Sequence, residues 1–398
     1  MIDKTYSQEV PPACPNAEMC GGCTYQGVEY PEQLSIKNDE VLKHLAANAI
    51  IPGEYKPTIN TSDITGYRNK MEYSFGDEVK DGPMTLGLHR KKSYMSVLNV
   101  DGCVIVPEDF NIIRAETLKY MESLEYSFYH KRSHKGFLRN LVVRRGEHTE
   151  ELLINLVTTD EEVLDEESFV KFILDLPLVG NVVGIIHTIN CKKSDTISRD
   201  SMKILHGRGH YYEELLGLKF RVDAFAFFQT NTTAVENMLL DAFELIKENE
   251  YCKTLYDVYC GTGTITLALA DSAEKVVGIE IIEDSVEAAK ENAVINGIEN
   301  CEFICGDALE ILEQLENSNS IPDMIVVDPP RMGIHPKALK KIISYNLPQI
   351  LYISCNPKTF CENMAVLQDA GYKLDTLRVF DNFPFTKHIE LCSIIIKN

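Results

Sequence analysis

Long apolar segments and positive charge are what this sequence of 398 residues has least of. It contains no run of about 18 apolar residues, which a membrane-spanning helix would need. Residues 1–7 lack the basic and then apolar pattern of a secretory signal. Only 39 Lys and Arg residues face 60 Asp and Glu residues, which gives a formal net charge of −21 and argues against binding of nucleic acid through overall charge. We therefore expect a cytoplasmic protein that is monomeric and has no membrane partner.

Repeats and low-complexity linkers are also absent, so the domain boundary is inferred from a change of pattern near residue 225. With 44% hydrophobic and 25% charged residues, a chain of this length can form two or three domains, each with its own core. We expect domains at 1–225 and 226–398. Twelve cysteines in a long chain without an export signal favour thiol chemistry or metal binding over disulfides.

The first domain is expected to be α+β. Residues 141–145 and 151–157 have the composition of neighbouring strands joined by a turn at Gly146, and residues 182–189 of another strand. Residues 161–175 show the amphipathic pattern of a helix.

Three basic clusters stand out against the acidic background, at residues 89–92, 130–139 and 144–145. Each cluster alone is as consistent with a solvated loop or strand surface as with binding of RNA. Because all three lie between residues 68 and 145, they favour an RNA-binding face on the first domain.

From about residue 230 the sequence alternates strand, turn and helix, which predicts a doubly wound, mostly parallel α/β sheet of the Rossmann type. Apolar runs predict strands at 254–259, 276–280, 301–305, 324–328 and 350–354. Helical patterns lie at 232–249, 263–271, 284–296, 308–316 and 336–345. Two later runs, 373–379 and 389–397, are expected to complete a seven-stranded sheet. Ligands of such sheets bind beyond the carboxyl ends of the strands.

A glycine-rich turn, DVYCGTGT at 257–264, follows the first of these strands. Gly261 and Gly263 allow backbone N–H groups to approach a ligand closely. The next strand ends at Glu280, a carboxylate suited to two ribose hydroxyls. Thr266 replaces the third glycine of the dinucleotide fingerprint, so we expect an adenosyl cofactor without a pyrophosphate. The alternative is a turn needed only for tight packing.

Two acidic residues follow later strands. Asp307 stands where it could contact adenine, or where it could only cap the next helix. Asp328 begins the sequence Asp-Pro-Pro-Arg, which is similar to the Asp-Pro-Pro-aromatic motif with which amino-methyltransferases hold an amine. Arg331 at the fourth position makes an amine substrate less attractive.

Cys355 follows the fifth strand, and its thiol suggests covalent chemistry on an electron-poor ring. A thiolate that adds to carbon 6 of uracil makes carbon 5 nucleophilic, so that it can take a methyl group. A base must then remove the proton on carbon 5, and Glu390 is the candidate. The alternative for Cys355 is an inert buried thiol, and the alternative for Glu390 is a carboxylate on the surface.

Three cysteines, Cys14, Cys20 and Cys23, lie within ten residues of one another on a glycine-containing loop. Together with Cys103 they could hold one metal centre. Their spacing does not distinguish a zinc ion from an iron–sulfur cluster.

These motifs occur in one order along nearly the whole chain. They are the cysteine segment at 14–23 with Tyr25 and Gln26, YRNK at 67–70, FFQTN at 227–231, the turn at 257–263, DPPR at 328–331, SCNP at 354–357 and FPFTKHIE at 383–390. In this order they resemble the RNA uracil-5 methyltransferases of bacterial ribosomal RNA.

The resemblance implies a class I methyltransferase fold for the second domain and S-adenosylmethionine as the methyl donor. It implies that Cys355 is the nucleophile, that Glu390 is the base, and that Phe227 or Phe228 stacks on a flipped uracil. The positions implied to contact S-adenosylmethionine or the uracil are Gln229, Tyr259, Thr264, Glu280, Asp307 and Asp328.

The resemblance also implies that Cys14, Cys20, Cys23 and Cys103 hold a [4Fe-4S] cluster, which favours iron over zinc. The implied substrate is RNA, with 23S ribosomal RNA first and transfer RNA second. Many members of the family begin with a small RNA-binding β-barrel, the TRAM domain. We expect it to be missing, because only thirteen residues precede Cys14.

Three other functions stay open. The first is methylation of the T-loop uridine of transfer RNA, whose enzymes generally lack the cysteine cluster. The second is cytosine-5 methylation, which uses the same thiol chemistry but commonly places the nucleophile in a Pro-Cys or Thr-Cys motif. The third is a catalytically silent RNA-binding or assembly protein, which the acidic charge favours and the intact Cys355, Asp328 and Glu390 oppose.

Overall fold

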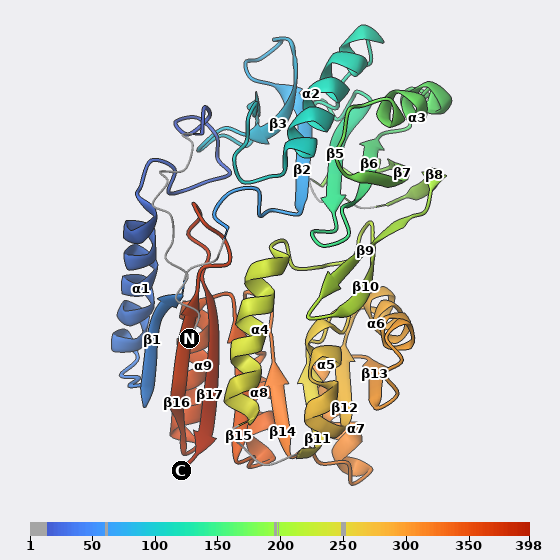
Figure 1. Ribbon diagram of the computed structural model, residues 1–398. Coiled ribbons are helices and arrows are strands. Elements are labelled where there is room, and N and C mark those ends of the chain that lie inside the picture. Colours follow the sequence, from blue (N-terminus) through green and yellow to red (C-terminus); the bar gives the residue numbers. More distant parts are fainter. Residues whose placement is uncertain (1–13, 60–62, 195–196, 198, 248–251) are drawn as a thin grey trace.

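The computed structural model describes residues 14–59, 63–194, 197, 199–247 and 252–398. The chain forms two lobes, each built on a sheet of its own, with the larger sheet in the lower lobe of Figure 1. No helix in the described ranges is both long and apolar enough to cross a membrane.

The lower lobe contains an eight-stranded sheet in the order β1-β16-β17-β15-β14-β11-β12-β13. All its strands run in one direction except β17, which is antiparallel to both neighbours. The strands are β1 (Glu54–Ile59), β11 (Cys252–Val258), β12 (Ala273–Glu280), β13 (Cys301–Cys305), β14 (Met324–Val327), β15 (Gln349–Ser354), β16 (Tyr372–Phe380) and β17 (Glu390–Lys397).

The predicted number of seven strands is therefore wrong by one. The seven expected strands are present, and β1 from the first half of the sequence adds an eighth by pairing with β16 at the edge of the sheet. Its sequence, EYKPTI, is mostly polar and contains a proline, and none of its residues is fully buried. A strand of this kind has no apolar run or alternation to reveal it, and proline is tolerated at an edge.

Helices cover both faces of this sheet (Figure 1). Alternate residues of each central strand point to opposite faces, as Leu255 and Tyr256 in β11 do. One face carries α4 (Thr232–Lys247), α5 (Thr264–Ala268) and α6 (Glu283–Ile295). The other carries α1 (Tyr30–Ala47), α7 (Ala308–Asn317), α8 (Pro336–Ser344) and α9 (Pro357–Asp369). This doubly wound arrangement confirms the predicted Rossmann-like architecture.

The upper lobe is α+β, as expected. Its seven-stranded sheet has the order β4-β3-β2-β5-β6-β7-β8 and is antiparallel except between β6 and β7. The elements are β2 (Lys70–Asp77), β3 (Met84–His89), β4 (Val97–Asn99), α2 (Glu108–Ser123), β5 (Leu138–Arg145), β6 (Glu151–Thr158), α3 (Glu166–Leu174), β7 (Asn181–Ile189) and β8 (Ser201–Gly207). Helix α3 begins later than predicted, because Asp165 caps it by accepting a hydrogen bond from the Ser168 N–H.

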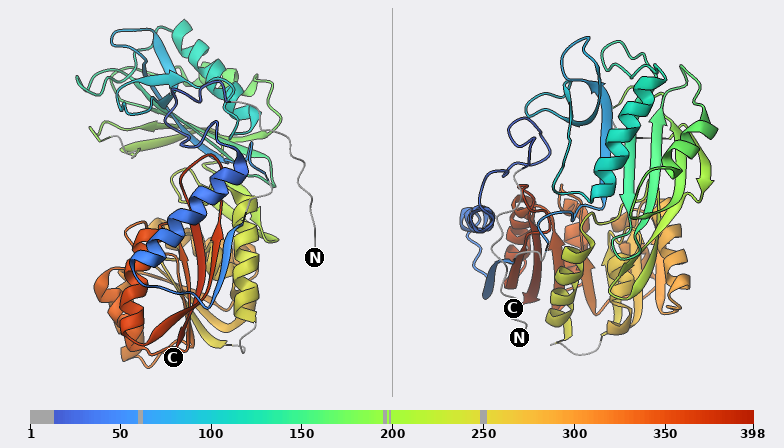
Figure 2. Two further views of the ribbon diagram at one scale, coloured as in Figure 1. Left: turned by 90° about the vertical axis from the view of Figure 1, so that its left-hand side faces the viewer. Right: turned by 45° about the horizontal axis from the view of Figure 1, so that its top comes forward.

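The lobes are joined by the hairpin of β9 (His210–Leu215) and β10 (Leu218–Asp223), which contacts the upper sheet through β9 and α6 through β10. The N-terminal segment also spans both lobes. Helix α1 packs against β1 and α9, so two elements from the predicted first domain lie on the sheet of the second (Figure 2).

Replacing Leu45 on α1 by alanine should lower the free energy of unfolding by about 2 to 5 kcal/mol. Leu45 is 3% exposed and belongs to the core on one face of the lower sheet. The matched control is Leu42→Ala on the same helix, whose side chain is 42% exposed and whose loss should change stability by about 0.5 kcal/mol or less. Urea denaturation measures both, and equal effects would contradict the packing of α1 on this lobe.

Candidate active site

A cavity of about 600 Å³ lies at the carboxyl ends of β11, β12, β14 and β15 and reaches the first residue of β17. Residues 227–230 and Arg68 complete its wall. The predicted residues that line it are Gln229, Tyr259, Gly261, Thr264, Glu280, Asp328, Cys355 and Glu390. Residues far apart in the sequence thus meet where the parallel strands end.

Asp307 is the predicted cofactor residue that does not line this cavity. Its side chain caps α7 by accepting hydrogen bonds from the N–H groups of Leu309 and Glu310. It is close enough to raise the pKa of Tyr259, which reaches about 12 mainly because of burial. The contact of Asp307 with adenine stays a prediction, while its role as a helix cap is observed.

The glycine-rich turn is held in an uncommon backbone conformation. Tyr259 has a φ of 74°, and its N–H and that of Cys260 both donate to the Ile279 carbonyl. A side chain at Gly263 would place its Cβ 3.0 Å from the Cβ of Ala289 and also 3.0 Å from the ring of Phe303. Only glycine fits there, so the turn lies close against the helix and strand beneath it.

Glu280 is oriented by two backbone groups. One carboxylate oxygen accepts the Gly261 N–H at 3.1 Å and the other accepts the Ile282 N–H at 2.9 Å. Each oxygen keeps a second lone pair for a ligand hydroxyl. The predicted pairing with two ribose hydroxyls is sterically available, because Glu280 lines the cavity.

At the other end of the cavity, Cys355 follows β15 directly. Asn356 connects its loop to the one after β14, since its side chain donates to the Arg331 carbonyl at 2.9 Å and also caps α9. Burial raises the pKa of the Cys355 thiol to about 11, with further increases from the negative charges of Glu390 and Asp328 and an opposing effect of Arg331. The thiolate form therefore requires additional positive charge near it.

Two carboxyl groups beside this thiol are also held toward their neutral forms. Burial and then the charge of Asp328 raise the pKa of Glu390 to about 8, although Arg331 and Lys37 lower it. Burial and the charge of Asp257 raise the pKa of Asp328 to about 7. A cationic ligand would stabilise all of these anions together.

The sequence does not assign a definite role to Phe227, Phe228 or His388, which lie at the cavity. Both phenylalanines line the cavity, but Phe228 is 4% exposed and belongs to the core, whereas Phe227 is 70% exposed. The exposed ring of Phe227 is therefore the better one for stacking on a ligand. His388 accepts a hydrogen bond from Arg331 at 3.1 Å, and burial followed by the Arg331 charge lowers its pKa to about 4.

The four predicted cysteine ligands come together. Cys14, Cys20, Cys23 and Cys103 all line one small cavity, of about 20 Å³, whose wall also contains Leu88. Within the described residues, however, no three or more His, Cys, Asp or Glu side chains are arranged to hold a single metal ion. The structure thus brings the thiols to one place without forming a mononuclear metal site.

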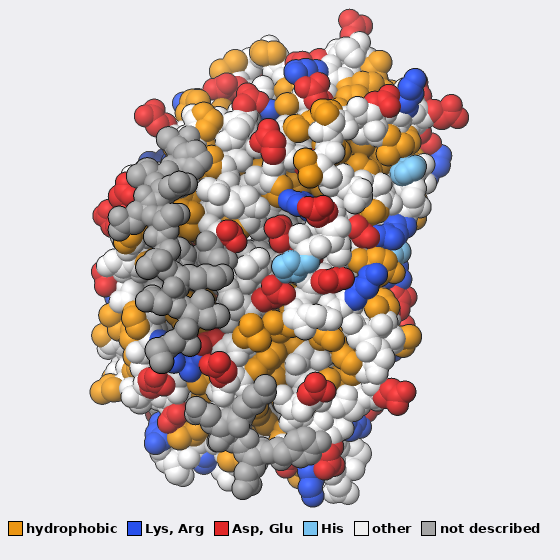
Figure 3. Space-filling model, in the orientation of Figure 1, with side chains coloured by type: hydrophobic (Ala, Val, Ile, Leu, Met, Phe, Trp, Pro, Cys, Tyr) orange, Lys and Arg blue, Asp and Glu red, His pale blue; other side chains and the backbone are white. Residues whose placement is uncertain are grey.

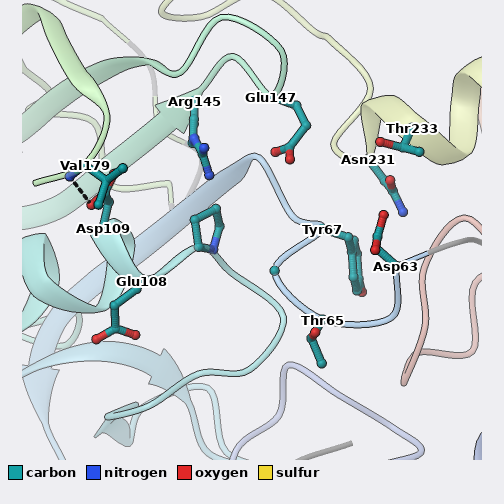
Figure 4. Close-up of a pocket in the computed structure, with 12 residues that line it drawn as sticks. Asp63, Thr65, Tyr67, Glu108, Asp109, Arg145, Glu147, Val179, Asn231 and Thr233 are labelled. Carbon is teal, nitrogen blue, oxygen red and sulfur yellow. Dashed lines mark hydrogen bonds between the residues drawn. The ribbon is translucent and has the colours of Figure 1, made fainter. Parts of the chain in front are cut away.

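A second large cavity, of about 460 Å³, lies beside residues 63–67 and contains none of the predicted site residues (Figure 4). Its wall contains four acidic residues, Asp63, Glu108, Asp109 and Glu147, and one basic residue, Arg145. The Asp109 carboxylate is already bound by the N–H groups of Val179 and Gly180 at 2.9 and 2.8 Å. This cavity lacks both a nucleophile and the glycine-rich turn.

The sequence and the fold of this chain are similar to those of known proteins. Residues 214–398 match the family described as tRNA (uracil-5-)-methyltransferase. An uncharacterized RNA methyltransferase of Clostridium tetani is 42% identical over 378 residues, which are 95% of this chain and 82% of that protein. The chain belongs to the same family as this RNA methyltransferase, and its residues 214–398 carry the match to the tRNA (uracil-5-)-methyltransferase family.

Other relatives agree with this assignment. An uncharacterized RNA methyltransferase of Clostridium acetobutylicum is 42% identical over 380 residues, covering 95% of this chain and 82% of that protein. The crystal structure of Pyrococcus abyssi tRNA (uracil-54, C5)-methyltransferase with S-adenosyl-L-homocysteine superposes with a TM-score of 0.78. It is 26% identical and covers 96% of this chain and 86% of that one.

Family membership makes the protein an S-adenosylmethionine-dependent RNA methyltransferase with a class I α/β fold, as predicted. The cavity suits this cofactor: its size is typical of sites for ligands of this class, and the glycine-rich turn and Glu280 meet at one end. Two carboxyl groups that line the cavity near Cys355, those of Asp328 and Glu390, suit a positively charged sulfonium.

Proposed function

We propose that the protein methylates carbon 5 of a uridine in RNA, with Cys355 as nucleophile and Glu390 as base. The observation that carries the proposal is that both side chains line the cavity that also contains the glycine-rich turn and Glu280. A thiol and a carboxyl group next to a methyl donor are what uracil-5 methylation requires. Nothing in methyl transfer to an amine or hydroxyl would call for the thiol.

The reaction balances with these two residues. The Cys355 thiolate forms a bond to carbon 6 of the uracil, and the electrons of the carbon 5–carbon 6 double bond become an enolate. Bound S-adenosylmethionine supplies a methyl group from its sulfonium, and carbon 5 accepts it. Glu390 then removes the proton from carbon 5, the double bond forms again, and the bond between carbon 6 and sulfur breaks to regenerate the thiolate.

Access to the thiol requires that the uracil leave its stack in the RNA. Phe227 is placed to receive it, because its ring is largely exposed and lines the same cavity as Cys355. Stacking of a base on an exposed aromatic ring contributes about 1 to 3 kcal/mol.

We further propose that Cys14, Cys20, Cys23 and Cys103 hold a [4Fe-4S] cluster. Their thiols line one cavity, and the preference for a cluster over a zinc ion rests on the sequence resemblance. A cluster is bound by four thiolates and spreads them over several iron atoms. Bound iron would also stabilise thiolates whose pKa burial raises, to about 12 for Cys23.

The proposed RNA target is 23S ribosomal RNA. The four cysteines favour ribosomal RNA over transfer RNA, because the enzymes that methylate the T-loop uridine of transfer RNA generally lack them. Transfer RNA is the second candidate, because the structure matches a tRNA (uracil-54, C5)-methyltransferase over 96% of the chain. Acidic side chains are spread over the face shown in Figure 3, so either RNA must be bound by a local basic surface.

The basic cluster at 89–92 and the first part of the second cluster, residues 130–135, supply such a surface, whereas Arg139 is buried and binds backbone carbonyls. They come together in space, since the Lys131 ammonium lies 3.4 Å from a ring nitrogen of His89. The first cluster also adjoins the cysteine segment, because the His89 carbonyl accepts the Gly21 N–H and the Lys91 N–H donates to the Met19 carbonyl. RNA bound there would lie against the proposed cluster.

Two substitutions separate the proposed chemical roles. Cys355→Ala should abolish 5-methyluridine formation and the covalent adduct with RNA that contains 5-fluorouracil. Glu390→Gln should still form an adduct but should turn over at least about 100-fold more slowly, because the carbon 5 proton stays in place. Gel electrophoresis under denaturing conditions detects the adduct. Methylation by the Cys355→Ala protein would rule out the proposed mechanism.

Anaerobically purified protein should contain about four iron and four sulfide ions per chain if the cysteines hold a cluster. Cys23→Ala should lose the associated visible absorption, whereas Cys191→Ala, which changes an exposed cysteine elsewhere, should keep it. Stoichiometric zinc without sulfide would show that the metal was assigned wrongly.

A strain that lacks this protein should lose the methyl group of one or a few uridines in 23S ribosomal RNA. Mass spectrometry of nuclease fragments from ribosomal and transfer RNA locates the missing methyl group. Loss of the methyl group from transfer RNA alone would replace the first candidate by the second, and restoring the wild-type gene is the control.

A further inference from the structure

The base Glu390 is positioned by an unusual loop. It is the first residue of β17, and residues 381–389 connect it to the end of β16. Most of this loop is buried, and Phe385 adopts a φ of 62°, a conformation that is strained for a bulky residue. Such a conformation persists only where surrounding contacts determine it.

A buried ion pair fixes the beginning of this loop. The Lys37 ammonium lies 2.5 Å from a carboxylate oxygen of Asp381, and the side chains of both residues are 0% exposed. The same ammonium donates to the Phe383 carbonyl at 3.1 Å, while the same carboxylate oxygen accepts the Phe383 N–H at 3.1 Å. Lys37 on helix α1 thereby binds both ends of the turn from Asp381 to Phe383. Lys37 and Asp381 are separated by 344 residues in the sequence.

The N-terminal segment also fixes the strained residue. The side-chain oxygen of Gln33, one turn before Lys37 on α1, accepts the Phe385 N–H at 2.8 Å. The Phe385 carbonyl accepts the N–H groups of Thr24 and Tyr25 at 2.9 and 2.8 Å. Both backbone groups of Phe385 are thus bound by residues from the start of the chain.

The charge of Lys37 is not explained by stability alone. A buried ion pair is commonly no more stabilising than apolar side chains of similar volume, because both charges must leave water. The second carboxylate oxygen of Asp381 finds no hydrogen-bond partner among the described residues. The positive charge does act on the reaction site, however, since Lys37 opposes the increase in the Glu390 pKa that burial causes.

We propose that Lys37, together with Asp381, is a positioning residue for Glu390, which holds the 381–389 loop in place and keeps a positive charge behind the base. This inference rests on the proposed role of Glu390. Lys37 lies outside the lining of the cavity and does not touch the substrate, so it acts through the loop and through its charge.

The test compares two steps of the reaction in the double variant Lys37→Met/Asp381→Asn. This variant removes both charges, so neither remains buried alone, and the amide oxygen introduced at position 381 can still accept the Phe383 N–H. Trapping on RNA that contains 5-fluorouracil does not need the base. Carbon 5 carries fluorine in place of hydrogen, so no proton can be removed from it and the covalent adduct persists. We expect trapping within about threefold of wild type, while turnover on natural RNA falls at least about tenfold and the covalent intermediate accumulates.

The dependence of turnover on pH gives a second measurement. The titratable groups that act on Glu390 are Lys37 on α1, Asp328 and Arg331 after β14, and Cys355 after β15. Loss of the Lys37 charge should raise the pKa of Glu390, so the rise of the rate with pH should move to higher pH. A residue with a purely structural role would lower the rate without this displacement.

Lys43→Met is the matched control, because Lys43 lies on the same helix with its side chain 74% exposed. It should leave trapping, turnover and the pH profile unchanged. Equal losses of trapping and turnover in the double variant, or unchanged turnover, would overturn the role of Lys37. Absence of trapping by the wild-type protein would instead overturn the proposed function from which this inference starts.

Discussion

The candidate active site depends on one constraint, which is the burial of several acidic side chains at the carboxyl edge of the lower sheet. Burial raises the pKa values of Asp257, Asp328 and Glu390, and the charges of Arg331 and Lys37 oppose this effect at Glu390. A sulfonium supplies the missing positive charge, whereas the thioether that is left after methyl transfer does not. The electrostatics of the cavity would therefore favour the charged methyl donor over the uncharged spent cofactor.

The cavity is assembled from three regions of the chain. The strands of the lower sheet supply the turn, Glu280 and Cys355; the connection between the lobes supplies Phe227 and Gln229; and Arg68, just before the first strand of the upper sheet, completes the wall. The upper lobe is thus attached beside the cavity. Under the proposed function, its basic clusters and its cysteines would affect which uridine is bound and would take no part in the chemistry.

Much of the second domain could be predicted from the sequence, because its central strands are continuous apolar runs and its motifs fall at their ends. Strand β1 could not, since its polar residues are stabilised by an edge pairing with β16 that no local pattern reveals. Helix α9 was missed although Asn356 as cap and Pro357 at the first position are a recognisable start. Lys37 looks like a surface residue in sequence, because its burial depends on Asp381 at the other end of the chain.

The pairing of the two ends of the chain has a consequence for how the protein is made. Helix α1 packs on β1, which follows it directly, but its other partners, α9 and Asp381, are synthesised more than 300 residues later, given a separation of 344 residues between Lys37 and Asp381. At about 5 to 20 residues per second, the apolar side of α1 waits on the order of tens of seconds for its binding surface. Val41 and Leu45 therefore reach their place in the core of the lower lobe only when most of the chain has been synthesised.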